Sequence, residues 1–137
     1  MNTLQLPAKM ESIESFRTFI LSKTEALDIP AETLSKIELA LEELLTNIVS
    51  YAYPNGAGSI ELDCCSEQSG SIRLRITDWG IPFDPLAIEP PDLTTGLEER
   101  QIGGLGIHLV RQMVDGLSYS REDGKNILQV LFRYGQA

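Results

Sequence analysis

The sequence lacks an excess of positive charge. It contains 11 lysine and arginine residues against 20 aspartate and glutamate residues, for a formal net charge of −9. A general nucleic-acid-binding protein needs a basic face to neutralise phosphates. We therefore expect no direct nucleic-acid binding, although a local basic patch or a basic protein partner stays compatible with this balance.

Long apolar runs are also missing. No stretch approaches the ~20 apolar residues that a membrane span requires. The first ten residues have neither the apolar run nor the basic flank of a signal peptide. These absences predict a cytoplasmic protein without membrane attachment.

Cysteine and histidine are scarce. Cys64 and Cys65 are adjacent in a strand-like segment, so their side chains should point to opposite faces. This is not a zinc-binding spacing, and a disulfide between neighbours would be strained. We expect both to be reduced and structural. His108, the single histidine, is interpreted as a surface or packing residue, with a phosphate-binding role as the less favoured alternative.

What is present indicates one globular domain. The 137 residues are 42% hydrophobic and 23% charged, which suits one domain with its own core. Apolar residues recur with helical or strand periodicity, and glycine or proline separates the periodic segments. The predicted strands are 3–7, 59–66, 71–77, 117–120 and 127–132, and the predicted helices are 11–27, 31–53 and 105–114. This order predicts an α+β two-layer sandwich with a mostly antiparallel, mixed sheet and its three main helices on one face.

Two glycine-containing stretches are candidates for a nucleotide site. A predicted strand ends in Asp78, followed by Trp79 and Gly80, and can present one carboxylate in a pocket. The cluster from Gly103 to Gly106 precedes a helix, where backbone N–H groups and the helix dipole suit phosphates. The ordinary alternatives are strand-to-turn punctuation and a flexible loop before a helix.

The second predicted helix adds a possible metal site. Glu43 and Asn47 are four residues apart and therefore share one helix face. A carboxylate and an amide oxygen at this spacing could hold Mg²⁺ and activate an attacking group. The alternative is a solvated acidic face, which we prefer for Glu38 and Glu42.

Together these pieces resemble the GHKL ATP-binding superfamily, which includes the ATPase domains of gyrase, histidine kinases and heat-shock chaperones. Glu43-Leu-Leu-Thr-Asn47 resembles its N box, Asp78-Trp-Gly-Ile-Pro-Phe-Asp-Pro85 its first glycine box, and Gly103-Gly-Leu-Gly106 its second. The resemblance spans nearly the whole chain, so residues 1–137 are expected to form one such domain. The short length and the Asp-x-Gly-x-Pro-Phe-Asp-Pro form are most similar to anti-sigma-factor serine kinases of bacterial partner-switching systems.

The resemblance implies a role for each matched residue. Asp78 would accept a hydrogen bond from the adenine amino group, and Gly80 would leave room for the base. The backbone N–H groups of Gly104, Leu105 and Gly106 would bind the phosphates of ATP.

The same resemblance assigns the chemistry of transfer. Asn47 would ligate the Mg²⁺ that bridges the phosphates, and Glu43 would be the general base for a serine hydroxyl. Residues 86–102, a long connection without clear periodicity, would form the ATP lid, with Arg100 as a candidate for the γ-phosphate.

Three positions depart from the family pattern or stay open. Tyr51 stands where related kinases often have histidine. Asn126 stands where the last strand often carries threonine; we include it among the nucleotide-binding residues, with its phosphate or water contact left open. Trp79 could flank the adenine pocket or pack against the core.

The resulting hypothesis is an ATP-dependent serine/threonine kinase acting as an anti-sigma factor in transcription regulation. It would bind a sigma factor and phosphorylate an anti-anti-sigma protein with a STAS domain, with a homodimer as a further possibility from the resemblance. The rival hypothesis is a regulatory module that binds ATP and sequesters a partner without catalysis. A histidine kinase is disfavoured because the chain has no helix pair carrying a phosphoacceptor histidine.

Overall fold

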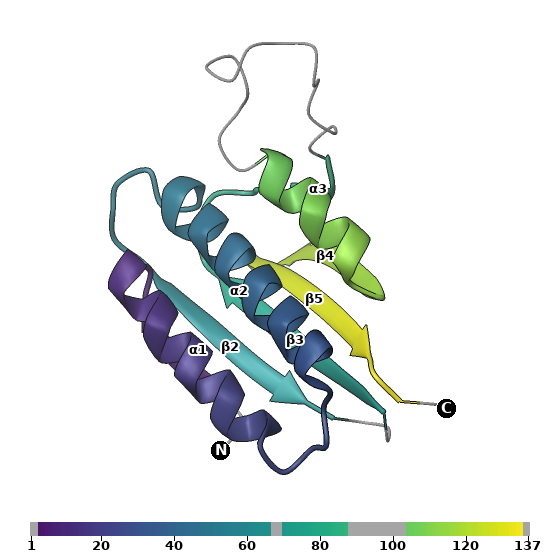
Figure 1. The fold of residues 1–137 in the computed structure, drawn as a ribbon. Helices are drawn as coiled ribbons and strands as arrows, with labels where there is room; N and C mark the ends of the chain where they lie inside the picture. Colours follow the sequence, from purple (N-terminus) through teal and green to yellow (C-terminus); the bar gives the residue numbers. More distant parts are fainter. Residues whose placement is uncertain (1–2, 67–69, 88–103, 136–137) are drawn as a thin grey trace.

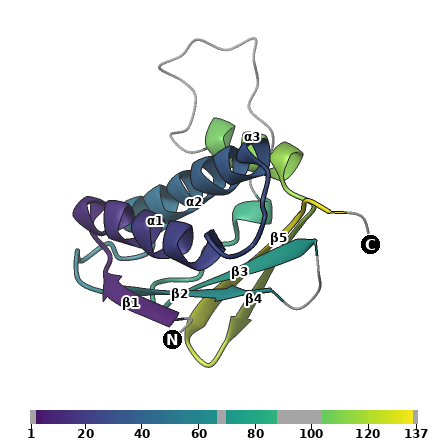
Figure 2. The ribbon, with the colours of Figure 1, turned by 60° about the horizontal axis from the view of Figure 1, so that its bottom comes forward.

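The computed structural model describes residues 3–66, 70–87 and 104–135. Five strands form one sheet in the order β1-β2-β3-β5-β4, and every pairing of these described strands is antiparallel. The helices lie on one face of the sheet (Figures 1 and 2). The predicted α+β sandwich is therefore confirmed. The elements are β1 (Thr3–Pro7), α1 (Met10–Thr24), α2 (Ala31–Tyr51), β2 (Ser59–Cys65), β3 (Ser71–Asp78), the short 3₁₀ helix η1 (Pro85–Ala87), α3 (Gly104–Met113), β4 (Gly116–Glu122) and β5 (Lys125–Arg133).

The core lies between the sheet and the helices, and α2 contributes the largest share of its helical residues. Alternate residues of β2, β3 and β5 face the helices and are buried, as a period of two requires. Residues at helical spacing on α2 cover them. The buried members of this layer are Ile37, Leu41, Leu44, Leu45, Ile48, Ile60, Leu62, Ile72, Leu74, Ile76, Leu128, Val130 and Phe132.

Element ends differ from the sequence prediction where local turns decide them. The first helix ends at Thr24 and not at residue 27, since the Leu27 N–H donates to the Thr24 carbonyl in a turn. The last two strands are longer than predicted. Asp123 and Gly124 both adopt positive φ, and this two-residue turn lets pairing continue to Glu122 opposite Lys125.

The register of the sheet brings three distant polar residues into one row. Asp78 at the end of β3 is paired with Asn126 on β5, and Asn126 is paired with Arg121 on β4. Directly opposite residues in an antiparallel pair are close neighbours. The end of the sheet therefore assembles a polar cluster beside an otherwise apolar layer.

Two other expectations concern cysteines and membrane spans. Cys64 is buried and Cys65 is exposed, and neither forms a disulfide, which confirms their opposite orientation. No helix within residues 3–66, 70–87 and 104–135 is both long and apolar enough to cross a membrane.

Candidate nucleotide-binding site

Asp78 is the centre of a buried hydrogen-bond network, and only 3% of its surface is exposed. Its Oδ1 accepts from the backbone N–H of Gly80 at 2.9 Å and from Asn126 Nδ2 at 2.8 Å. Burial raises the pKa of the Asp78 carboxyl, and the hydrogen bonds from Asn126 and Gly80, with the charge of Arg121, partly oppose this rise. The site thus holds a carboxylate in a costly environment, which is typical of functional positions.

Asn126 uses its whole side-chain amide. Its Nδ2 donates to Asp78 and also to the Ile81 carbonyl at 2.8 Å. Its Oδ1 accepts from the Tyr119 hydroxyl at 2.5 Å and from the Phe83 N–H at 3.4 Å. Two donor and two acceptor bonds complete the capacity of an amide. Asn126 therefore belongs to the Asp78 end of the site.

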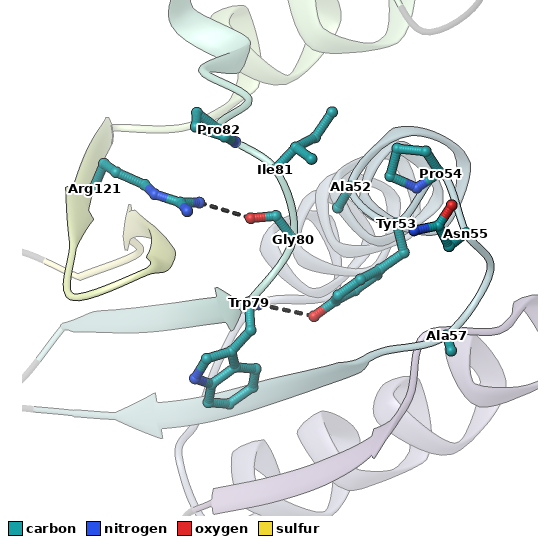
Figure 3. Close-up of a pocket in the computed structure, with 10 residues that line it drawn as sticks. All are labelled: Ala52, Tyr53, Pro54, Asn55, Ala57, Trp79, Gly80, Ile81, Pro82 and Arg121. Atoms are coloured by element: carbon teal, nitrogen blue, oxygen red, sulfur yellow. Dashed lines mark hydrogen bonds between the residues drawn. The ribbon is translucent and has the colours of Figure 1, made fainter.

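Besides Asn126, residues at the end of α2 and on β4 hold the loop after Asp78 (Figure 3). The Trp79 N–H donates to the Tyr53 hydroxyl at 2.8 Å, and that hydroxyl donates to the Ser59 carbonyl at 2.6 Å. Arg121 Nη1 donates to the Gly80 carbonyl at 2.7 Å, and the Ile81 N–H donates to the Ala52 carbonyl at 2.8 Å. The backbone position of this loop is consequently fixed from the end of α2 and from β4.

Close approach explains the glycine at position 80. A Cβ built there would overlap the carbonyl group of Ala52, which belongs to the C-cap residue of α2. Backbone cannot yield as a side-chain end can, so no other residue fits without moving the loop. The sequence predicted that Gly80 leaves room for a base. The structure adds a second reason for glycine, the close packing against Ala52, which the sequence did not reveal.

The outer side of this loop lines an open groove of about 340 Å³ (Figure 3). Trp79, with 39% of its surface exposed, and Ile81 lie along it. Trp79 is therefore more a surface residue than a core residue, and the alternative of packing receives little support.

Asn47 and Glu43 share a face of α2 as predicted. Asn47 is buried, and its Nδ2 has no hydrogen-bond partner among the described residues. A buried amide without a partner is costly and rare in proteins. Glu43 is half-buried, and its carboxylate lies so close to Gly106 that a Cβ on that glycine would overlap it. The N-box helix and the second glycine box are therefore in direct contact.

The other acidic residues of α2 behave as expected for a solvated face. Glu38 pairs with Arg17 at 2.7 Å, and Glu42 is exposed. Tyr51 is stacked on Phe83, with ring centroids 5.7 Å apart. His108 is half-buried on α3, and its Nε2 lies 3.1 Å from Gln112 Nε2. None of these contacts indicates a catalytic role.

Three of the predicted site residues line one small cavity. Its walls include Asn47, Asp78 and Asn126, together with Phe83 and Ile107. The cavity measures about 10 Å³, roughly the space that one water molecule needs. A purine base could enter only if the irregular segment that carries Phe83 moved outward.

The phosphate end of the predicted site is described in part. Gly104, Leu105 and Gly106 form the first turn of α3, where backbone N–H groups lack intrahelical acceptors. Arg100, Gly103 and residues 88–102 of the predicted lid lie outside the described residues. Leu86 and Ala87, the first residues of the predicted lid, belong to η1.

Sequence reasoning missed three residues of the site: Tyr53, Tyr119 and Arg121. The last two could have been found from the Asp-Gly pair at 123 and 124, which lies between the predicted strands 117–120 and 127–132 and is typical of a two-residue hairpin turn. Counting outward from Asp123-Gly124 places Arg121 opposite Asn126. Tyr53 carries no such signal, because its contact with Trp79 depends on how the end of α2 meets β3.

Comparison with known proteins agrees with this geometry. A family model described as histidine kinase-like ATPase domain matches residues 6–132. The serine/threonine-protein kinase BtrW of Bordetella bronchiseptica is 37% identical over 93 residues, which are 67% of this chain and 65% of that protein. The serine-protein kinase RsbW of Bacillus thuringiensis is 22% identical over 133 residues, which cover 94% of this chain and 82% of that protein.

Solved structures show the same fold. The RsbU and RsbW domains of a Mycobacterium tuberculosis protein superpose with a TM-score of 0.63 at 12% identity, covering 100% of this chain and 34% of that one. The mycobacterial sensor histidine kinase MprB gives a TM-score of 0.56 at 16% identity, covering 93% of this chain and 97% of that one. At such identities the likeness concerns the fold alone.

The fold and the arrangement of motifs define an ATP-binding α+β domain. More particularly, the chain belongs to the histidine kinase-like ATPase domain family, in agreement with the GHKL resemblance of its three motifs. The activity expected from the sequence is the one for which its relatives BtrW and RsbW are named.

Proposed function

We propose that this protein is an ATP-dependent serine/threonine kinase that acts as an anti-sigma factor. It binds a sigma factor, and it phosphorylates an anti-anti-sigma partner of the STAS type on serine or threonine. The observation that supports the kinase proposal best is the contact between the Glu43 carboxylate and Gly106, because the proposed base and the proposed phosphate-binding turn are then neighbours. The names of BtrW and RsbW support the same activity.

The residues present fit ATP with Mg²⁺. The buried Nδ2 of Asn47 has no hydrogen-bond partner among the described residues, and a phosphate oxygen or a water molecule beside it would be an acceptor for this donor. The other amide atom, Oδ1, is the one that would bind Mg²⁺. One protein oxygen with substrate phosphates and water is a usual coordination for Mg²⁺, which would neutralise the phosphate charge during transfer. Asp78 would bind the base, and the first turn of α3, from Gly104 to Gly106, would bind phosphates through backbone N–H groups.

Glu43 has the chemistry of a general base. It takes the proton from the partner's hydroxyl while that oxygen forms a bond to the γ-phosphorus of ATP and the bond to ADP breaks. Charge neutralisation and alignment supply most of the catalysis in phosphoryl transfer. We retain Arg100 and the remainder of the lid at 86–102 as proposed contributors to the γ-phosphate site.

Substitutions on one helix separate chemistry from binding. Glu43→Ala removes only the base, so ATP binding and partner binding should persist while transfer falls ~10²–10⁴-fold. Asn47→Ala removes the metal ligand, so Mg·ATP affinity and transfer should both fall. Glu42→Ala is the matched control, because this neighbour on the same helix is an exposed glutamate. The assays are ATP titration calorimetry and phosphate incorporation into a purified STAS-domain partner.

Two outcomes would contradict the proposal in different ways. Full transfer by Glu43→Ala would refute the assignment of the base. A native chain that holds ATP and its partners but transfers nothing would establish the rival function, a regulatory module that sequesters a partner. Tyr51 and Asn126, the two departures from the family pattern, would then be the first residues to exchange.

A further inference from the structure

We propose that Asn126 and Tyr119 are positioning residues that hold the Asp78 carboxylate by its Oδ1, so that Oδ2 is the acceptor turned toward the purine. This inference rests on the proposed nucleotide function. It assigns base discrimination to a pair of residues on β4 and β5 in addition to Asp78. Their contacts with each other and with backbone groups carry the argument.

Backbone neighbours determine which way the Asn126 amide points. The Ile81 carbonyl can only accept, so it must face Nδ2, and the Phe83 N–H can only donate, so it must face Oδ1. These two backbone groups therefore admit only one orientation of the amide. A flipped amide would oppose like groups at both positions.

Tyr119 secures the same orientation from the edge strand. Its hydroxyl donates to Asn126 Oδ1 at 2.5 Å, and Asn126 is 3% exposed, so water offers little substitute. With both hydrogens and both lone pairs engaged, rotation of the amide would break several buried hydrogen bonds together.

The consequence falls on Asp78. Both hydrogen bonds that the described residues make to its carboxylate end on Oδ1, one from Asn126 and one from Gly80. Oδ2 is therefore the oxygen left to meet a base. An ionised carboxylate oxygen only accepts, so it suits a 6-amino purine and repels the oxygen of a 6-oxo purine.

Comparison of ATP with ITP tests this discrimination, because the two share ribose and triphosphate. The native chain should prefer ATP. Asn126→Leu, which keeps bulk without donors, should reduce the ratio of ATP to ITP affinity by about tenfold. Tyr119→Phe, which loses one hydroxyl, should reduce the ratio less. The control Tyr134→Phe alters a tyrosine that packs on the core and should leave the ratio unchanged.

A polarity reversal provides a second and independent readout. In Asp78→Asn, the donors of Asn126 and Gly80 would hold the new Oδ1 in place and turn Nδ2 toward the base. The preference should then invert in favour of ITP, and adding Asn126→Leu should weaken that inversion.

The outcomes separate this inference from the function on which it rests. If Asn126→Leu and Tyr119→Phe weaken ATP and ITP by the same factor, the pair merely packs, and only the positioning role is overturned. The same holds if Asp78→Asn keeps a preference for ATP. A native chain that binds neither nucleotide overturns both proposals. Should Asn126→Leu fail to fold, the Tyr119→Phe ratio and the Asp78→Asn inversion still decide.

Discussion

At Asp78 the requirements of folding and of binding oppose each other. The carboxyl is buried, and its pKa is raised because burial disfavours the charged form. Below pH 3.8, which is the ordinary pKa of this group, Asp78 makes its full contribution to the stability of the fold. That contribution is lost as the pH rises through the pKa that Asp78 has in the folded chain. Base binding needs the ionised form that folding disfavours.

Asp78→Asn should therefore separate stability from affinity. Near neutral pH the variant should unfold at higher urea concentration than the native chain, with the difference shrinking as the pH falls toward 3.8. ATP binding should weaken by ~1.5–3 kcal/mol, the range for a charged hydrogen bond. Native ATP affinity should likewise decline as acid protonates Asp78. Equal affinity of the native chain for ATP and GTP in calorimetry would contradict the assignment of Asp78 to the base.

The two cysteines differ in reactivity for a similar reason. Burial raises the pKa of the Cys64 thiol to about 11, and the thiolate is the reactive form. Cys65 is exposed on the next residue of β2. An aromatic disulfide reagent at neutral pH should modify one thiol quickly and the second only on unfolding. Cys65→Ser should abolish the fast phase. If it abolished the slow phase instead, Cys65 and not Cys64 would be the buried cysteine.

Among the structural elements, α2 contributes most to the site, because both glycine boxes meet it. Gly80 touches the Ala52 carbonyl at its end, and Gly106 touches the Glu43 carboxylate in its middle. The two neighbouring groups differ in how easily they can move. A backbone carbonyl is fixed, whereas a carboxylate is the end of a flexible side chain. Equivalent substitutions at the two glycines should therefore have different effects.

Gly80→Ala should destabilise the fold by ~1–3 kcal/mol, the usual cost of forced overpacking. Gly106→Ala should leave stability nearly unchanged, yet lower phosphoryl transfer by up to ~10²-fold by displacing Glu43. Gly116→Ala provides an intermediate comparison, since a Cβ there would lie 3.3 Å from Leu131 Cβ, a tight contact that a small shift relieves; its cost should be smaller than that of Gly80→Ala. Thermal unfolding and transfer assays on the three variants test the contrast. A Gly106→Ala variant with native transfer would exclude any catalytic use of the Glu43 contact.

The elements were predictable where periodicity was strong. The apolar alternation of Ile72, Leu74 and Ile76 defined β3, and the buried stripe of α2 defined that helix. Their ends were less predictable, since hydrogen bonds in turns decide where pairing stops. The Asp123-Gly124 turn lengthened β4 and β5 beyond their apolar residues.

For the whole molecule, the family and the fold class followed from the sequence, while the pairing of distant strands did not. No local sequence pattern predicts that β3 lies beside β5. Yet this pairing allows the hydrogen bond between Asp78 and Asn126, which are 48 positions apart. The sequence therefore identified Asp78 as an acceptor but offered no way to see what orients it. The roles of Glu43, Asn47, Gly104 and Gly106 toward ATP stay predictions, and Arg100 lies outside the described residues.

Trp79 gives the molecule an optical property. It is the single tryptophan of the chain, it directly follows Asp78, and its indole is partly exposed beside Tyr53. Indole emission changes colour and intensity with the polarity around the ring, so the intrinsic fluorescence of the protein comes mainly from this loop. Because a base can enter only if the Phe83 segment shifts, saturating ATP should change that emission. Tripolyphosphate should leave it unaltered, and a spectrum unmoved by ATP that calorimetry shows to be bound would mean that this loop stays still.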